Sequence, residues 1–296
     1  MTPVDLCGLE LAHPVLNGSG TFDAIAARRV FGDALLEQFP FAAFVSKTIT
    51  LAPRDGNPPP RLYETPAGMI NSIGLPNKGL RGYLEHDLPE LAALPVPLIT
   101  NVMGSSAEEL AELAEACDAR EEIAALELNV SCPNVKTGLD IGADPRELEA
   151  VVAHVRPRTR KPLLVKLTPN TADVPACAAA AEVAGADAVS LINTLRAMAW
   201  TDTTPARPWL GARTGGLSGP AVRAVALAQV AAVAARVEIA VVGMGGIQSG
   251  RHAHQFLDAG ATAVAVGTET FRDPAAGARI AAELRAISAK SGVFAG

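Results

Sequence analysis

The chain has 296 residues, of which 49% are hydrophobic and 19% charged, and its formal net charge is -6. This composition supplies a sizeable core, and an acidic balance without a basic cluster argues against nucleic acid as a partner. The four cysteines, Cys7, Cys117, Cys132 and Cys177, show no CxxC spacing, so they form neither an iron–sulfur or zinc signature nor a secreted disulfide framework.

Neither a leader peptide nor a membrane span is expected from the sequence. The N-terminus lacks the basic region and apolar run of a signal peptide. No apolar stretch reaches the ~20 residues that a membrane span needs. We therefore expect a soluble, cytoplasmic protein without a membrane partner.

Short apolar segments alternate with helical patterns along the chain, which indicates βα units and a parallel sheet. Their near-continuous Val, Ile, Leu and Ala content is typical of strands buried on both faces. No linker or low-complexity segment divides the chain, so the sequence predicts an α/β fold, one (β/α)8 TIM barrel domain over residues 1–296. The eight predicted core strands are Pro14–Asn17, Ala42–Ser46, Pro97–Asn101, Ala124–Val130, Leu163–Leu167, Ala188–Ile192, Ile239–Val242 and Ala263–Val266.

Each predicted strand is followed by polar residues or glycine at its C-terminal end. In a barrel these ends meet at one mouth, where active sites lie. Eight polar ends together are difficult to explain as ordinary surface, so we predict the site there. In chain order the ends are Ser19-Gly20, Lys47-Thr48, Asn101, Asn129 with Cys132, Lys166, Asn193-Thr194, Gly243 with Gly245-Gly246, and Gly267-Thr268.

Glycine-rich loops follow the seventh and eighth strands, at Gly243–Gly246 and Gly267-Thr268. Barrels often bind a phosphate at this position, using bare backbone N–H groups. Glycine is also the default residue of a tight turn. Two such loops together favour a phosphate site.

Two lysines, Lys47 and Lys166, lie in apolar strand sequence near the predicted mouth. A lysine in such surroundings costs desolvation energy unless an anion compensates it. The pair suggests a doubly anionic occupant, such as a cofactor with an acidic substrate. Either lysine alone could extend to the rim, and a buried lysine of lowered pKa could form a Schiff base, which keeps an aldolase as an alternative.

A thiol and a set of carboxamides complete the predicted site. Carboxamides both donate and accept hydrogen bonds, so a cluster of them suits a planar ring with alternating N–H and C=O groups. Cys132 precedes Pro133, which ends the strand, and is well placed to act on a bound ligand. Alone it would be interpreted as a small buried hydrophobe. The carboxamides are Asn71, Asn101, Asn129, Asn134 and Asn193.

The remaining titratable residues predict no metal site and no hydrolytic chemistry. His252 and His254 are two residues apart and fall on different helix faces. No pair of carboxylates follows the strands, so general acid–base hydrolysis lacks its residues. We expect Cys7, Cys117 and Cys177 to be structural.

Together these motifs resemble the dihydroorotate dehydrogenases, flavin enzymes of pyrimidine synthesis. The resemblance extends from about Leu6 to Asp273. Cysteine at position 132 is similar to the soluble class 1 enzymes, and the continuation Val135–Gly138 resembles class 1B more than class 1A. The motifs are Asn17–Gly20, Ser46–Thr48, Gly56–Arg61, Asn71–Leu75, Glu127–Gly138, Val165–Leu167, Ile192–Thr194, Gly215–Gly219 and the two glycine loops.

The resemblance implies bound FMN and the oxidation of dihydroorotate to orotate. Its phosphate would lie on Gly245, Gly246, Gly267 and Thr268. The rest of FMN would be surrounded by Ser19, Lys47, Thr48, Asn101, Asn129, Lys166, Ile192 and Gly219. The substrate would be held by Lys47, Asn71, Ser72, Ile73, Gly74, Leu75, Asn129, Asn134, Asn193 and Thr194.

In the implied reaction, Cys132 is the base that takes a proton from C5 while hydride leaves C6 for flavin N5. A thiol, with a reference pKa of ~8.5, suits this task if the site favours its thiolate. Lys166 would counter the negative charge that develops on the reduced flavin. The sequence has neither iron–sulfur spacing nor a G-x-G-x-x-G unit, so electrons must leave the chain. The class 1B resemblance implies a homodimer with a second subunit that carries FAD and an iron–sulfur cluster, ending at NAD.

Other functions stay open at this point. A related dihydropyrimidine-type flavin oxidoreductase would lack the carboxylate recognition, and a Schiff-base aldolase or lyase would use Lys166. Class 1A relatives pass electrons to fumarate directly. A purely structural or binding role leaves the converging strand ends unexplained.

Overall fold

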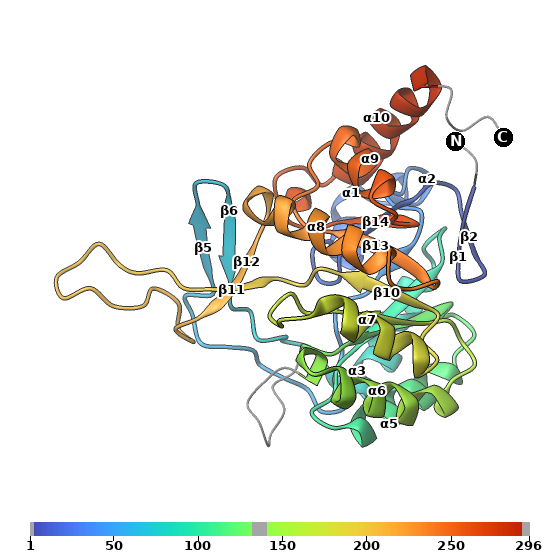
Figure 1. The fold of residues 1–296 in the computed structure, drawn as a ribbon, viewed down its shortest axis with the longest axis horizontal. Helices are drawn as coiled ribbons and strands as arrows, with labels where there is room; N and C mark the ends of the chain where they lie inside the picture. Colours follow the sequence, from blue (N-terminus) through green and yellow to red (C-terminus); the bar gives the residue numbers. More distant parts are fainter. Residues whose placement is uncertain (1–2, 132–140, 292–296) are drawn as a thin grey trace.

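The computed structural model describes residues 3–131 and 141–291, and its centre is an eight-stranded sheet (Figure 1). The strand order is β3-β14-β13-β10-β9-β8-β7-β4, and the neighbouring strands are all parallel. This confirms the eight predicted core strands. They are β3 (Val15–Asn17), β4 (Phe44–Val45), β7 (Leu98–Val102), β8 (Ala125–Asn129), β9 (Leu163–Lys166), β10 (Ala188–Leu191), β13 (Ala240–Met244) and β14 (Ala263–Val266).

The side chain of Asn17 closes the sheet between β3 and β4. Its carboxamide accepts a hydrogen bond from Val45 N and donates one to Val45 O, both at 2.8 Å. One backbone bond, Ala42 N to Val15 O at 3.0 Å, joins the same two segments. Asn17 is completely buried. The carboxamide therefore replaces a stretch of backbone ladder and completes the barrel.

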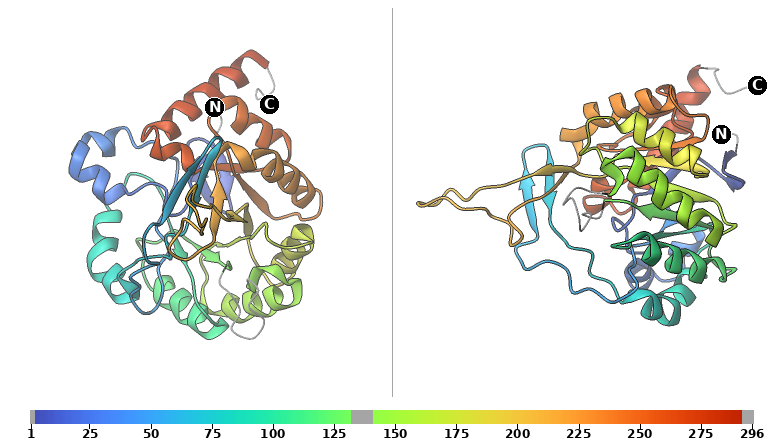
Figure 2. Two further views of the ribbon diagram at one scale, coloured as in Figure 1. Left: turned by 90° about the vertical axis from the view of Figure 1, so that its left-hand side faces the viewer. Right: turned by 60° about the horizontal axis from the view of Figure 1, so that its bottom comes forward.

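Helices surround the barrel (Figure 2, left). Ser106 is the N-cap of α5, and its side chain accepts from Glu109 N; Asp144 is the N-cap of α6, and its side chain accepts from Arg146 N and Glu147 N. The α-helices are α1 (Ala24–Phe31), α2 (Ala34–Glu37), α3 (Gly79–Gly82), α4 (Leu88–Leu91), α5 (Ala107–Asp118), α6 (Pro145–Val155), α7 (Val174–Val183), α8 (Arg223–Ala234), α9 (Gly250–Asp258) and α10 (Ala276–Ser291). A π-helix, η1 (Tyr83–Asp87), joins α3 to α4, and 3-10 turns lie at η2 (Ile141–Ala143), η3 (Arg156–Arg158), η4 (Pro220–Val222) and η5 (Thr268–Phe271). No helix in the described ranges is long and apolar enough to cross a membrane.

Strand alternation divides the core into two layers. On β8, Leu126 and Leu128 face the helices, whereas Ala125 faces the barrel interior. Interior residues such as Leu16, Ile99 and Leu164 fill the lower half of the barrel. Next along the inward-facing positions of β8 come two polar residues, Glu127 and Asn129, both buried. The barrel interior is thus apolar below and polar at the mouth.

A hairpin packs its apolar side chains on the lower layer. It consists of β1 (Val4–Leu6) and β2 (Leu9–Leu11), paired antiparallel. Leu6 and Leu11 are fully buried and join the cluster of interior barrel residues. The tight turn between the strands needs positive φ at Cys7 and Gly8.

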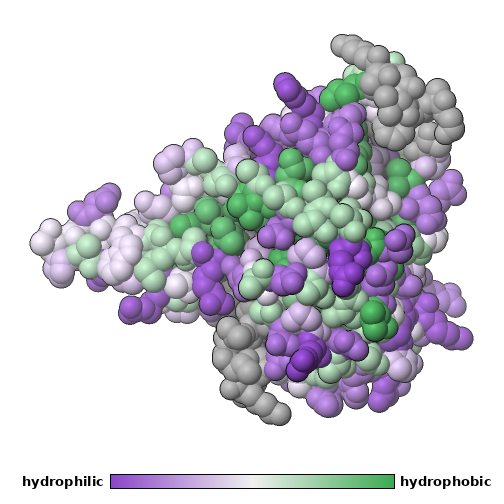
Figure 3. Space-filling view, viewed as in Figure 1, coloured by the Kyte–Doolittle hydropathy of each residue, from purple (hydrophilic) through white to green (hydrophobic). Residues whose placement is uncertain are grey.

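A separate antiparallel sheet projects from the barrel (Figures 1 and 2). Its order is β11-β12-β6-β5, from β5 (Leu62–Thr65), β6 (Gly68–Asn71), β11 (Leu195–Ala197) and β12 (Gly215–Ser218). The sequence patterns described above do not predict this sheet. This sheet and the segment between β11 and β12 form the projecting part of the molecule in Figure 3. The large apolar side chains exposed on them are Leu62, Met198, Trp200 and Trp209.

The closure by Asn17 predicts a measurable cost for Asn17→Ala. The substitution leaves the N–H and C=O of Val45 without partners inside the barrel, at about 1–3 kcal/mol for each group. We expect a loss of about 3 kcal/mol in the free energy of unfolding, measured by urea denaturation. A loss below about 1 kcal/mol would show that backbone bonds alone close the barrel.

Candidate active site

Ser19, Lys47 and Thr48 come together just beyond β3 and β4. Ser19 Oγ donates to Ser46 O at 2.8 Å and lies 3.3 Å from Thr48 Oγ1. A Cβ placed on Gly20 would lie 3.7 Å from Lys47 Nζ, so the ammonium lies against the loop after β3. The barrel closure thus places all three predicted residues at one side of the mouth.

Lys47 and Lys166 differ in environment. Lys166 ends β9 and is buried beside Asn129, its register partner on β8. Lys47 follows the end of β4 and is solvent-exposed, which corrects the expectation that it lies inside a strand. Desolvation by the surrounding protein still lowers the pKa of Lys47, and the carboxylate of Asp23 partly offsets this.

Among the described residues, no carboxylate forms an ion pair with either lysine. A buried ammonium without a counterion is unfavourable, so the Lys166 site suits an anion or an electron-rich group.

A buried carboxylate that the sequence analysis missed lies beneath the mouth. Glu127 on β8 accepts hydrogen bonds from Asn101 Nδ2 and, at 2.7 Å, from Ser190 Oγ. These bonds fix the orientation of the Asn101 carboxamide. Asn101 Oδ1 is buried and accepts no hydrogen bond from the described part of the chain. Because Glu127 binds the Nδ2 of Asn101, the Oδ1 of Asn101 is left to accept from an N–H group of a ligand.

The loops after β13 and β14 have the predicted features of a phosphate cradle. Gly245 and Gly246 adopt φ of 130° and 73°, which favour glycine. Their backbone N–H groups, and those of Gly267 and Thr268, donate to no acceptor in residues 3–131 or 141–291. Bare N–H groups of this kind bind phosphate oxygens. The residues present therefore fit a phosphorylated cofactor.

Two further predicted cofactor residues pack against these loops. A Cβ on Gly246 would lie 2.8 Å from Gly219 O, and one on Gly245 would lie 3.4 Å from Ile192 Cγ1. Gly219 also approaches Thr268, whose Oγ1 donates to Ser218 Oγ at 2.8 Å. The predicted cofactor residues that follow β10, β12, β13 and β14 therefore lie side by side in the structure.

The carboxamides after β8 and β10 are hydrogen-bonded to each other. Asn193 Nδ2 donates to Ser131 Oγ at 2.8 Å and to Asn129 Oδ1 at 3.4 Å. Asn193 Oδ1 accepts from Thr194 N at 2.8 Å. Because these side chains bind one another, the carboxamide cluster is held in place before any ligand arrives.

The predicted substrate segment Asn71–Leu75 begins at the last residue of β6 and runs from the antiparallel sheet to the barrel. Asn71 Nδ2 donates to Gly216 O at 3.3 Å, and Asn57 Nδ2 donates to Ser72 Oγ at 3.0 Å. Asn57 N also donates to Ile73 O, and Gly74, at φ of 76°, leaves room for the Asn57 side chain. Leu75 packs against the buried cluster of Met103 and Ile141, and Met103 directly follows β7. The segment therefore reaches the barrel beside the end of β7.

Two predicted residues, the base Cys132 and the carboxamide Asn134, lie outside the described residues. The other three cysteines are unsuited to act as bases. Burial raises the pKa of Cys117 to about 12 and of Cys177 to about 11, and it raises that of Cys7 to about 12 with smaller effects of Asp187 and Asp5. These thiols stay protonated at neutral pH, in agreement with a structural role.

The fold and the mouth define a (β/α)8 barrel in which the glycine loops after the last two strands fit a phosphorylated cofactor. The family model for dihydroorotate dehydrogenase matches residues 1–287. The chain therefore belongs to the dihydroorotate dehydrogenase family.

Curated relatives agree over nearly the whole chain. A "Dihydroorotate dehydrogenase B (NAD(+)), catalytic subunit" of Desulforudis audaxviator is 47% identical over 296 residues, covering 99% of this chain and 94% of that protein. Proteins of the same name from Geobacter sulfurreducens and Pelobacter propionicus are 46% and 49% identical, covering 98% and 94% of this chain and 94% and 90% of theirs.

Proposed function

We propose that this chain catalyses the FMN-dependent oxidation of (S)-dihydroorotate to orotate, a step of de novo pyrimidine biosynthesis, in the cytoplasm. The observation that carries the proposal is one mouth that combines a phosphate cradle, the buried Lys166 and a cluster of carboxamides. Membership of the dihydroorotate dehydrogenase family supports this activity over an aldolase that would use Lys166 as a Schiff base.

The residues at the mouth fit FMN in two respects. The N–H groups of Gly245, Gly246, Gly267 and Thr268 would bind the phosphate, and Asn101 Oδ1 would accept from an N–H group of the ring. Bound FMN would supply the acceptor for the hydride that leaves C6 of the substrate. The other residues that would hold FMN are Ser19, Lys47, Thr48, Asn129, Lys166, Ile192 and Gly219.

The substrate presents a carboxylate and a ring with alternating N–H and C=O groups. Lys47 would bind the carboxylate, since its ammonium is open to the mouth and unpaired with any described carboxylate. The carboxamides of Asn71, Asn129 and Asn193 would match the ring edge. The remaining substrate-binding residues in the proposal are Ser72, Ile73, Gly74, Leu75, Asn134 and Thr194.

Catalysis in this proposal needs a base and a fixed positive charge. Cys132 would take the proton from C5, and the raised pKa values of the other three thiols leave it as the candidate cysteine. Lys166 would stabilise the negative charge that develops on reduction, because its ammonium is held in a buried position before the reaction starts.

The electrons are proposed to leave through a second subunit. The relatives are named NAD(+)-dependent catalytic subunits, and that name implies a partner subunit. We infer a homodimer of this chain associated with a subunit that carries FAD and an iron–sulfur cluster.

The first prediction of the proposal concerns the bound ligands. Acid-released supernatant of the purified protein should contain one FMN per chain. Orotate should perturb the visible spectrum of the oxidised protein, whereas uracil, which lacks the carboxylate, should not. A folded, colourless protein that cannot be reconstituted with FMN would contradict the proposal, and equal responses to uracil and orotate would favour a related dihydropyrimidine oxidoreductase.

The second concerns Cys132→Ser, with Cys7→Ser as the matched control. Cys132→Ser should retain FMN and orotate binding but oxidise dihydroorotate far more slowly, with partial recovery at high pH because serine is a weaker acid. Cys7, near the opposite end of the barrel, donates to Asp187 O, a bond that serine can also make, so Cys7→Ser should keep wild-type rates. Unchanged single-turnover flavin reduction in Cys132→Ser would refute the role of this thiol.

The third concerns the electron acceptor. The isolated chain should turn over with artificial dyes but reduce NAD negligibly, because its sequence has no second redox motif. Efficient reduction of fumarate by the chain alone would contradict the partnered, class 1B arrangement.

A further inference from the structure

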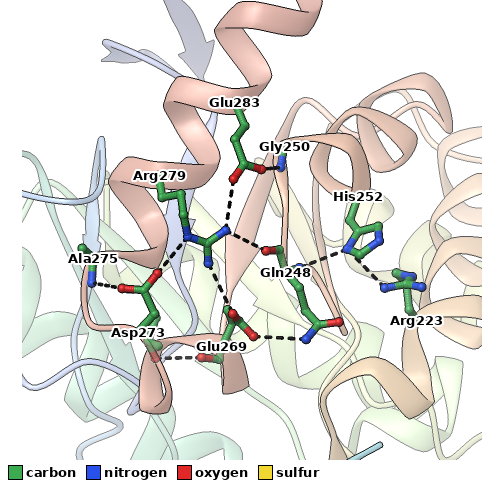
Figure 4. Close-up of polar contacts among 11 residues, drawn as sticks. Arg223, Gln248, Gly250, His252, Glu269, Asp273, Ala275, Arg279 and Glu283 are labelled. Carbon is green, nitrogen blue, oxygen red and sulfur yellow. Dashed lines mark hydrogen bonds and ion pairs between the residues drawn. The ribbon is translucent and has the colours of Figure 1, made fainter.

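Arg279 on α10 binds four residues behind the predicted phosphate cradle (Figure 4). Its guanidinium donates from Nε to Asp273 Oδ2 at 2.8 Å and from Nη1 to Gln248 O at 3.0 Å. It also donates from Nη1 to Glu283 Oε1 and from Nη2 to Glu269 Oε1, both at 3.2 Å. Four of its five N–H groups are therefore used.

Two of these partners belong to the cradle loops themselves. Glu269 directly follows Thr268 at the start of η5, and Gln248 lies two residues after Gly246. The two are also bonded to each other, since Gln248 Nε2 donates to Glu269 Oε2 at 3.2 Å. Arg279 thus bridges the loop after β13 and the loop after β14 from the side of α10.

The network extends to the start of α9. Glu283 accepts from Gly250 N at 2.7 Å as well as from Arg279. On the opposite side of Gln248, His252 Nδ1 accepts from Gln248 N at 3.3 Å and lies 3.1 Å from Arg223 Nη1, which in turn donates to Gly246 O. Both faces of the β13 loop are therefore fixed by side chains.

Charge gives Arg279 a second effect on the cradle. Three carboxylates surround one guanidinium, and Glu269 is buried. Without Arg279, the negative charge of Glu269 would stand uncompensated next to Thr268, where it would repel an anion. Glu269 is screened little because its side chain is only 7% exposed, whereas Arg279 is 37% exposed, so solvent weakens this ion pair only in part.

We propose that Arg279 is a positioning residue for the cofactor phosphate. It holds the loops of Gly245-Gly246 and Gly267-Thr268 in register, so that their bare N–H groups face one phosphate, and it neutralises Glu269 beside them. The inference rests on the proposed FMN site and assigns to Arg279 no contact with the flavin ring.

The test compares FMN with riboflavin, which has the same ring but no phosphate. Dissociation constants would be measured by flavin fluorescence on flavin-free protein for wild type, Arg279→Gln, Arg279→Lys and Arg285→Gln. Arg285 is an exposed residue further along α10 and serves as the matched control. Circular dichroism and thermal melting would establish that each variant is folded.

We expect Arg279→Gln to weaken FMN binding by about tenfold, the lower end of the loss seen when residues that orient metal ligands are removed. Riboflavin binding should be unchanged, and Arg285→Gln should match wild type for both ligands. Arg279→Lys should lie between, because lysine keeps the charge but lacks the planar five-donor geometry. It also provides the test if Arg279→Gln does not fold.

Two results would overturn the inference. Equal weakening of FMN and riboflavin would indicate general damage to the barrel, and unchanged FMN affinity in both Arg279 variants would show that the loops keep their register unaided. Failure of the wild-type protein to bind either flavin would instead contradict the proposed function itself, so the two failures are distinguishable.

Discussion

The hydrogen bonds between Asn17 and Val45 are the constraint on which the rest of the site depends. The strand β3 and the strand β4 begin and end the order of the sheet, and a single buried carboxamide supplies both a donor and an acceptor between them. Only a closed barrel brings all strand ends to one mouth. Ser19 binds Ser46 and Thr48 directly beyond this closure. The same junction between β3 and β4 therefore also positions these residues of the site.

The alternation of side chains inside the barrel then decides what the mouth can do. Apolar residues such as Ala125 and Leu164 fill the lower interior, and polar groups are confined to the upper positions of the same strands. Glu127 and Lys166 are both buried there, on neighbouring strands. Glu127 binds Asn101 and Ser190, so its hydrogen bonds are made within the protein, whereas Lys166 is paired with no described carboxylate. The carboxylate of Glu127 is therefore satisfied by hydrogen bonds within the protein, whereas the ammonium of Lys166 is left to bind a ligand.

Much of this architecture was predictable because it depends on local patterns. Eight near-continuous apolar segments and their polar ends predicted the strands and the mouth, since a parallel sheet is buried on both faces. The antiparallel sheet was missed because its strands are three or four residues long and partly exposed, and β12 pairs with β6 about 145 residues away. Nothing in such short segments distinguishes a strand from a loop.

In the site, too, residues marked by their neighbours in the sequence could be predicted, whereas residues whose partners are distant in the sequence could not. Lys166 was predicted correctly as buried, but Lys47 is exposed, although its neighbours Ser46 and Thr48 are buried. An acidic residue within the apolar strand around Glu127 was a signal of the same kind as the lysines and could have been recognised. The sequence around Arg279 gave no such signal, because the partners of Arg279 lie up to 31 residues away along the chain and meet only in the folded barrel. The roles of all the predicted site residues, Cys132 and Asn134 included, stay predictions.

The most direct measurement is anaerobic mixing of the flavin-loaded protein with (S)-dihydroorotate, followed by the visible absorption of the oxidised flavin. We expect that absorption to be lost in a single turnover while orotate forms in an equal amount, because the mouth would hold the cofactor and the substrate side by side. An absorption that persists with dihydroorotate, in a sample that dithionite fully bleaches, would contradict the assignment of this mouth as the site of dihydroorotate oxidation.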